Sequence, residues 1–142
     1  MSGVLYTTEI LRLAASTGAF ARLANPQASA EKRSPICGSR VTVDLTLDSE
    51  GRISELGQEV RACALGQASA ALMGASALGK TASDLDAAST LLKSWLSGAQ
   101  DHSGDWPGLD IFAPARAHPG RHAAILLPFE AAAESAHAAS AN

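Results

Sequence analysis

Two cysteines, Cys37 and Cys63, have the most chemically distinctive side chains in this sequence, and they are its only cysteines. A thiolate is both a nucleophile and a good ligand for zinc and for iron–sulfur clusters. Between them, residues 40–47 alternate polar and apolar side chains, residues 48–51 have the composition of a turn, and residues 52–62 can return as an antiparallel strand. Both ends of such a hairpin lie on the same side, so we expect the two sulfur atoms to be neighbours.

Cys63 also begins a predicted helix over residues 63–74. Backbone N–H groups at the start of a helix carry partial positive charge and favour a thiolate, so this position suits sulfur or metal chemistry. The alternative is that each cysteine is a small buried hydrophobic residue, which is the usual state of a free cysteine. The spacing alone leaves both interpretations open.

Histidines are the other candidate metal ligands, and the chain has four of them: His102, His118, His122 and His137. Only His118 and His122 have the spacing of a helical ligand pair, and Pro119 and Gly120 interrupt it. An isolated pair of this kind is more often a pair of surface residues than a metal site. These two histidines become candidate ligands only if the corner over residues 118–122 folds next to the cysteines.

Residues 74–81 match the letters of a phosphate-binding loop, with Gly74 followed by Gly79, Lys80 and Thr81. Such a loop must follow a buried strand and open a helix. Here it follows a predicted helix of small residues, so the context disfavours a nucleotide site. An ATP-binding titration would test this least favoured alternative.

Composition limits the classes of partner and compartment. The chain has 142 residues, 46% of them hydrophobic, and a formal net charge of −3. A single domain over residues 1–142 is long enough to bury about two-thirds of its unfolded surface without disulfides. The acidic balance disfavours nucleic acid, and no apolar run approaches the roughly 18 residues of a membrane span. Without a basic, apolar leader at the N-terminus, we expect a cytoplasmic protein with reduced thiols.

Periodicity and turn residues predict the remaining elements. The expected order is a helix over 5–17, an edge strand over 27–34, the hairpin of 40–62, helices over 63–74 and 81–98, a short helical segment over 109–117, the corner over 118–122, and a terminal helix over 123–139 that frays from about residue 135. Pro128 either kinks this last helix or marks its first turn.

Several local strings occur in the same order as in a known family. They are Leu5-Tyr6 with Glu9-Ile10-Leu11 and Asn25-Pro26, Pro35-Ile36-Cys37-Gly38 with Arg40, Cys63 with Ala68 to Met73, Gly79-Lys80-Thr81, and Leu109 with Pro119-Gly120-Arg121 and Leu126 to Glu130. Together they resemble the U-type iron–sulfur cluster assembly scaffolds, the NifU N-terminal family with its SufU-like and IscU-like members. The resemblance spans nearly the whole chain.

The resemblance implies an α+β fold, with a three-stranded antiparallel sheet and helices packed on one face. It implies a scaffold-like or sulfur-acceptor function, rather than that of a turnover enzyme, in which Cys37 and Cys63 are the reactive thiols and metal ligands. The implied cofactor is an iron–sulfur cluster or zinc. The implied partner is a cysteine desulfurase or another iron–sulfur assembly factor.

Two departures from the family pattern concern the ligands themselves. The third cysteine of the family matches Ala124, and the aspartate after its Cys-Gly pair matches Ser39, so two of four ligands remain. His122 or His118 would complete a metal site only if the corner over residues 118–122 faces the hairpin. Otherwise the chain holds no cofactor. The alternative function is therefore a degenerate homologue that binds a desulfurase without carrying metal or sulfur.

Overall fold

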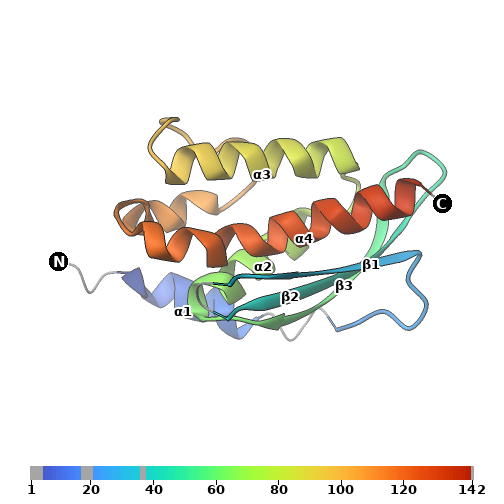
Figure 1. Cartoon of the computed structure of the whole chain (residues 1–142), viewed down its shortest axis with the longest axis horizontal. Coiled ribbons are helices and arrows are strands. Elements are labelled where there is room, and N and C mark those ends of the chain that lie inside the picture. Colours follow the sequence, from blue (N-terminus) through green and yellow to red (C-terminus); the bar gives the residue numbers. More distant parts are fainter. Residues whose placement is uncertain (1–4, 17–20, 36–37, 142) are drawn as a thin grey trace.

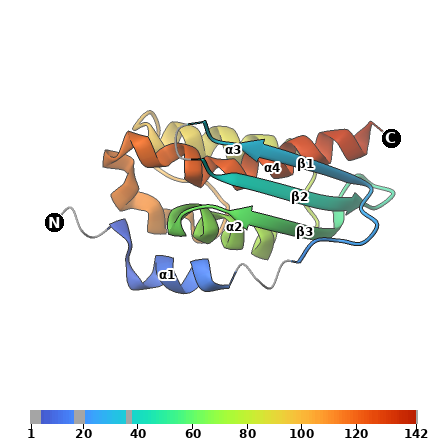
Figure 2. The same cartoon turned by 60° about the horizontal axis from the view of Figure 1, so that its bottom comes forward.

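The sheet has three antiparallel strands in the order β1-β2-β3, namely β1 (Ala28–Arg33), β2 (Arg40–Leu47) and β3 (Ile53–Arg61). They belong to a computed structural model that describes residues 5–16, 21–35 and 38–141. β1 pairs with β2, and β2 pairs with β3 (Figure 2). The predicted hairpin and the predicted edge strand before it are confirmed.

Two helices, α2 (Ala64–Ser76) and α4 (His122–Ser140), cover one face of this sheet. The other helices are α1 (Thr8–Ala15), which packs on α2, and α3 (Ala82–Leu96), with 3-10 helices η3 (Leu109–Ala117) and η4 (Pro119–Arg121) before α4. α4 packs on β1 and β2, α2 packs on β3, and α3 forms a further layer on α4, at the top of Figure 1. The α+β fold is therefore confirmed. Within the described residues, no helix combines the length and apolarity needed to cross a membrane.

Alternation along β2 explains which of its faces carries the helices. Val41, Val43 and Leu45 are fully buried, while Thr42 between them is only half-buried. The turn into β3 is held by Asp48, whose carboxylate accepts hydrogen bonds from two backbone N–H groups of residues 50 and 52. Period-two burial is what a strand with one covered face requires.

Side-chain caps set where two of the helices begin. Thr7 caps α1 by accepting a hydrogen bond from the N–H of Ile10 at 3.2 Å, so the regular helix begins at Thr8, within the predicted segment 5–17. Thr81 and Asp84 form a reciprocal capping box at the start of α3. This arrangement satisfies two of the backbone donors that a helix start leaves unpaired.

The C-terminal segment is more ordered than the sequence suggested. α4 continues to Ser140, and Ser135, Ala136 and Ala139 on it are buried. The amide of Gln27 donates a hydrogen bond to the backbone oxygen of Ala139 at 3.3 Å. Burial of this alanine face therefore replaces the fraying expected from residue 135. Pro128 lies inside α4 rather than in its first turn.

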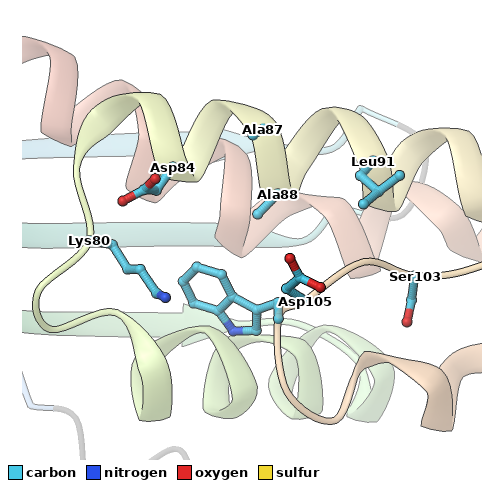
Figure 3. Close-up of a pocket in the computed structure, with 8 residues that line it drawn as sticks. Lys80, Asp84, Ala87, Ala88, Leu91, Ser103 and Asp105 are labelled. Carbon is cyan, nitrogen blue, oxygen red and sulfur yellow. The ribbon is translucent and has the colours of Figure 1, made fainter.

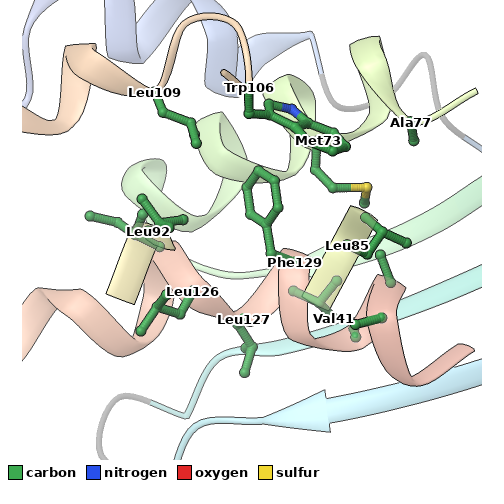
Figure 4. Packing of buried hydrophobic residues seen from close by; sticks show 14 of the residues in the cluster. Val41, Met73, Ala77, Leu85, Leu92, Trp106, Leu109, Leu126, Leu127 and Phe129 are labelled. Atoms are coloured by element: carbon green, nitrogen blue, oxygen red, sulfur yellow. The ribbon is translucent and has the colours of Figure 1, made fainter. Parts of the chain in front are cut away.

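The core lies between the sheet and the helices, with aromatic rings at its centre (Figure 4). Phe129 of α4 meets the ring of Trp106 edge-on, with 5.1 Å between centroids. The indole N–H of Trp106 donates to the backbone oxygen of Leu72 at 2.9 Å, so the only polar atom of this ring is satisfied. Alanines such as Ala132 are fully buried in α4, which lets the neighbouring elements approach closely.

The segment over residues 21–27 crosses the opposite, open face of the sheet. Asp44 of β2 is fully buried beneath it and accepts two hydrogen bonds from Arg22, at 2.6 and 3.0 Å. The same carboxylate accepts from the hydroxyl of Ser29 and the N–H of Leu23. Gly57 lies opposite Asp44, and a Cβ there would come within 2.8 Å of the Leu23 nitrogen. The crossing therefore requires glycine at this point of β3.

Candidate functional site

Cys63 lies in the short connection between β3 and α2. It is the N-cap residue of α2, with an extended backbone, and its thiol is free. The residue is half-buried and packs against the edge of the core. No side-chain hydrogen bond caps the helix at this position. Cys63 is therefore not fully enclosed in the core, and its role as a reactive thiol stays a prediction.

The other predicted thiol, Cys37, lies outside the described residues, so the expected proximity of the two sulfur atoms stays a prediction. The residues around it are described. The N–H of Ser34 donates to the oxygen of Ser39 at 2.9 Å, and the N–H of Gly38 donates back to Ser34 at 3.0 Å. Arg40, which begins β2, is the register partner of Arg61 at the end of β3. The described ends of this loop thus lie at the same end of the sheet as the start of α2.

The start of α4 packs directly on the start of α2. A Cβ placed on Gly66 would lie 3.7 Å from the Cβ of Ala124 and 3.2 Å from its carbonyl oxygen. The hydroxyl of Ser69 donates to the backbone oxygen of Ile125 at 2.5 Å. Gly66 follows Cys63 by three positions, and residues at this spacing share a helix face. The corner over residues 118–122 therefore leads into α4, whose first turns face the Cys63 end of α2.

His122 begins α4, and its ring is held in one orientation. Nε2 lies 2.9 Å from the backbone oxygen of Ala115. A carbonyl oxygen only accepts hydrogen bonds, so this contact places a proton on Nε2, and in the neutral ring Nδ1 is then the acceptor atom. Metal-binding histidines are commonly oriented in this way by a second hydrogen bond. The role of His122 as a ligand remains a prediction.

The other histidines take different positions. His118 precedes η4 and is half-buried, and His102 is exposed in the loop before Trp106. His137, near the end of α4, contacts a carboxylate oxygen of Asp86 on α3 at 2.6 Å. The opposite ends of α4 therefore carry His122 and His137, and His122 comes two residues before Ala124, which packs on the start of α2.

The residues that match a phosphate-binding loop form a different structure, shown in Figure 3. They run from the last turn of α2 to the N-cap of α3, so a helix and not a strand comes before them. The Lys80 ammonium lies 5.5 Å from the centroid of the Trp106 ring, and it lines a groove of about 260 Å³ together with the carboxylates of Asp84 and Asp105. A hydrogen bond from the backbone of Thr81 is the main cause that lowers the pKa of Asp84. A groove lined by two carboxylates is unsuited to a polyphosphate, which agrees with the prediction against a nucleotide site.

Comparison with known proteins identifies the family of this chain. No protein-family model matches the sequence, and no curated protein matches it. Among solved structures, the N-terminal part of a nitrogen-fixing NifU-like protein from Brucella abortus matches with a TM-score of 0.88 and 33% identity, over 100% of this chain and 99% of that one. The chain belongs to the NifU-like family of U-type scaffold proteins. The family resemblance inferred from the sequence strings is confirmed.

A second solved structure extends the match in fold. It is a putative iron–sulfur cluster assembly scaffold protein for the SUF system from Fervidobacterium islandicum AW-1. The TM-score is 0.85, with 21% identity, over 96% of this chain and 99% of that one. At this identity the likeness shows that the two proteins share a fold.

The donor groups of the described residues do not make the four-ligand metal site of the family pattern. Ser39 is buried and offers only a neutral hydroxyl, and Ala124 is buried and offers a methyl group. Across residues 5–16, 21–35 and 38–141, no three side chains of His, Cys, Asp or Glu form a group that could hold a metal ion. A resident zinc with four protein ligands therefore does not fit the described part of this chain.

Gly66 was missed by the sequence analysis, although a glycine inside a helix is itself a signal of close approach. We expect Gly66→Ala to lower the free energy of unfolding by about 1–3 kcal/mol. The added Cβ would lie 2.7 Å from the Cβ of Ala62 and would press on α4 at Ala124. Urea unfolding measures the change. Gly120→Ala is the control, since a Cβ there meets nothing within 4 Å; equal stability of the two variants would contradict the close packing of α2 on α4.

Proposed function

We propose that this U-type family member accepts sulfur during iron–sulfur cluster assembly, with Cys63 as the acceptor thiol and Cys37 as the second thiol. The observation that carries the proposal is the half-buried, free Cys63 at the start of α2, in a chain of this family. The similar Fervidobacterium protein is described as a putative scaffold for this assembly. The donor implied by the family resemblance is a cysteine desulfurase.

The transfer step needs no group beyond the two thiols. The Cys63 thiolate attacks the outer sulfur of a persulfide on the donor protein and forms a new S–S bond. The donor's own S–S bond breaks, and its cysteine leaves as a thiolate with the electron pair, so no oxidant or reductant is consumed.

Sulfur acceptance agrees better with the remaining ligands than cluster assembly on this chain alone. A [2Fe–2S] cluster is held by four ligands, usually thiolates. The chain has two cysteines, and the positions matched to the other family ligands hold Ser39 and Ala124. A cluster, as the cargo of assembly, would need ligands from another molecule.

Persulfide mapping tests the proposal. The purified protein is incubated with L-cysteine and a cysteine desulfurase from the same organism, and its peptides are analysed by mass spectrometry. We expect the Cys63 peptide to gain the mass of one sulfur atom, and Cys63→Ser to abolish this gain. In the matched control, Ala62→Cys in the Cys63→Ser background moves the thiol away from the N-cap and should accept little sulfur. A wild-type protein that gains no sulfur would contradict the proposal.

A second candidate function rests on the same two positions. Ser39 and Ala124 cannot act as thiolate or carboxylate ligands. The alternative function is therefore a module that binds the desulfurase and carries neither sulfur nor metal. Stable binding of the desulfurase without any persulfide on Cys63 or Cys37 would favour this function over sulfur acceptance.

The accessibility of Cys63 gives a further prediction. We expect iodoacetamide to modify Cys63 in the folded protein near neutral pH, because the residue is half-buried rather than enclosed in the core. Peptide mapping after timed alkylation measures the rate. Labelling that begins only after addition of denaturant would instead assign Cys63 a packing role.

A further inference from the structure

Three arginines lie side by side across the sheet. Arg33 of β1 is the register partner of Arg40 of β2, which is in turn the partner of Arg61 of β3. All three belong to the open face, because the neighbouring Val41 faces the helices. We call these three residues the arginine row. Arg33 and Arg61 are about two-thirds exposed, and Arg40 is about one-third exposed.

Repulsion within the arginine row lowers the stability of the sheet. Like charges directly opposite each other on neighbouring strands destabilise a sheet. The next row along the open face holds Glu31, Thr42 and Glu59, so only two carboxylates lie beside three guanidinium groups. Glu31 contacts Arg33 at 2.8 Å and Arg40 at 3.9 Å.

The second carboxylate is shared in the same way. Glu59 contacts Arg61 at 3.1 Å and also Arg22 at 3.6 Å. Arg22 is already paired with the buried Asp44. The negative charge of Glu59 is shared between Arg61 and Arg22, so it neutralises the arginine row only in part. The arginine row therefore keeps uncompensated positive charge on an exposed edge of the open face.

The arginine row lies at the end of the sheet that leads to Cys63. Arg61 ends β3 and Arg40 begins β2, so the row marks the end of the sheet from which α2 and Cys63 continue, on the left in Figure 2. A protein that brings a persulfide into bonding distance of Cys63 has to approach this end. The row is then beside the approaching surface.

The chemistry of the row selects a carboxylate-bearing partner. A guanidinium group binds carboxylates through two parallel hydrogen bonds. Neighbouring strands are about 4.8 Å apart, so the row spans about 10 Å, which two or three acidic side chains of one protein segment can cover. A nucleic acid is disfavoured, because Glu31 and Glu59 flank the row and the chain has a net charge of −3.

We propose that the arginine row is a docking surface for an acidic segment of the protein that transfers sulfur to Cys63. This inference rests on the proposed function, since it assigns the surface by which the donor reaches the acceptor thiol. The donor places its carboxylates across Arg33, Arg40 and Arg61 and thereby relieves the repulsion within the row. Attraction of this kind steers association and weakens as salt screens it.

Charge reversal on the row tests the proposal. The variant Arg33→Glu with Arg61→Glu leaves the less exposed Arg40 in place. The matched control, Arg12→Glu with Lys93→Glu, makes the same change in net charge on α1 and α3, where both residues are exposed. Binding of a cysteine desulfurase from the same organism is titrated at several salt concentrations, and persulfide on Cys63 is measured in parallel.

We expect the row variant to bind roughly tenfold more weakly than wild type near 0.1 M salt, with a shallower dependence on salt, while the control stays within about twofold. Circular dichroism and the alkylation rate of Cys63 confirm that fold and thiol are intact. Equal binding of wild type, row variant and control would overturn the docking surface, even if Cys63 accepts sulfur.

The two readouts separate the inference from the proposed function. Binding that depends on the row without any persulfide on Cys63 supports the docking surface and contradicts sulfur acceptance. Persulfide formation that is insensitive to the row supports sulfur acceptance and contradicts the docking surface. A desulfurase that neither binds nor transfers sulfur to the wild-type protein contradicts both.

Discussion

Replacing Asp44 by asparagine is expected to lower the free energy of unfolding by about 3 kcal/mol at neutral pH. The carboxylate is fully buried and accepts hydrogen bonds from Arg22, Ser29 and the N–H of Leu23. Removing its charge leaves Arg22 without its main partner. The Arg22 side chain is 46% exposed, so water solvates part of its charge and the loss stays near the lower end of the range for a broken buried pair.

The effect of Asp44→Asn should depend on pH. Burial is the largest single influence and opposes ionisation of Asp44, but the hydrogen bonds from Arg22, Ser29 and Leu23 together outweigh it and lower its pKa. An unfolded aspartate has a pKa of about 3.9. Because the folded pKa lies below this value, the stabilisation is fully present above about pH 4 and is lost as the pH falls through the folded pKa.

Urea unfolding of wild type and Asp44→Asn at neutral pH and below about pH 3 measures this difference. The gap between the two proteins should shrink at acidic pH, because wild-type Asp44 becomes protonated. Asp105→Asn, at an exposed loop position, is the control and should change stability by no more than about 0.5 kcal/mol. A gap that is the same at both pH values would show that the charge of Asp44 does not hold the 21–27 segment.

Local patterns predicted most of the elements but missed this crossing. The alternation along residues 40–47 predicted a strand, and it also made Asp44 look like an ordinary outward-facing polar residue. Its burial depends on Arg22, which is 22 positions away in the sequence. No local periodicity reports a contact of that kind, although Gly57 in the neighbouring strand is a sign of close backbone approach.

The end of α4 shows a second limit of local patterns. An alanine-rich terminal segment has little side-chain area of its own, so the sequence predicted fraying. In the fold this segment lies against β1 and α3, and Ala136 and Ala139 are buried there. Tertiary packing, rather than helix propensity, therefore decides where α4 ends.

The candidate site could be predicted in part. Cys63 was proposed as a reactive thiol from its type and position, and that role stays a prediction; the family resemblance pointed to the corner before α4. The packing of Ala124 beside Gly66 agrees with that expectation. The arginine row could not be predicted, because it depends on the register of two strand pairs, and a shift of one residue would move each arginine to the other face.

The lost ligand positions lead to the second large prediction. We expect Ser39→Asp combined with Ala124→Cys to create a four-ligand zinc site together with Cys37 and Cys63. Ser39 and Ala124 are both buried, and Ala124 faces the start of α2, where Cys63 lies. A complete structural zinc site contributes on the order of 10 kcal/mol of apparent binding free energy.

Thermal and chemical unfolding with zinc and with a chelator measure the gain. At a zinc concentration about a thousandfold above the dissociation constant, the double variant should be more stable by about 4 kcal/mol. Without zinc it should be less stable than the parent, because burying a carboxylate at position 39 removes it from water. Each single substitution should recover only part of the effect, since ligands of one ion are coupled.

The matched control for this prediction is Ser39→Asp with Ala124→Ser, which fills nearly the same volume but supplies a hydroxyl in place of a thiolate. It should gain much less stability from zinc, because zinc prefers thiolate to a neutral hydroxyl. The parent should respond weakly, through Cys37, Cys63 and at most His122. If the double variant binds zinc no better than this control, position 124 does not face the two thiols. The family match of Ala124 to a ligand would then be wrong, while sulfur acceptance by Cys63 would stand on its own test.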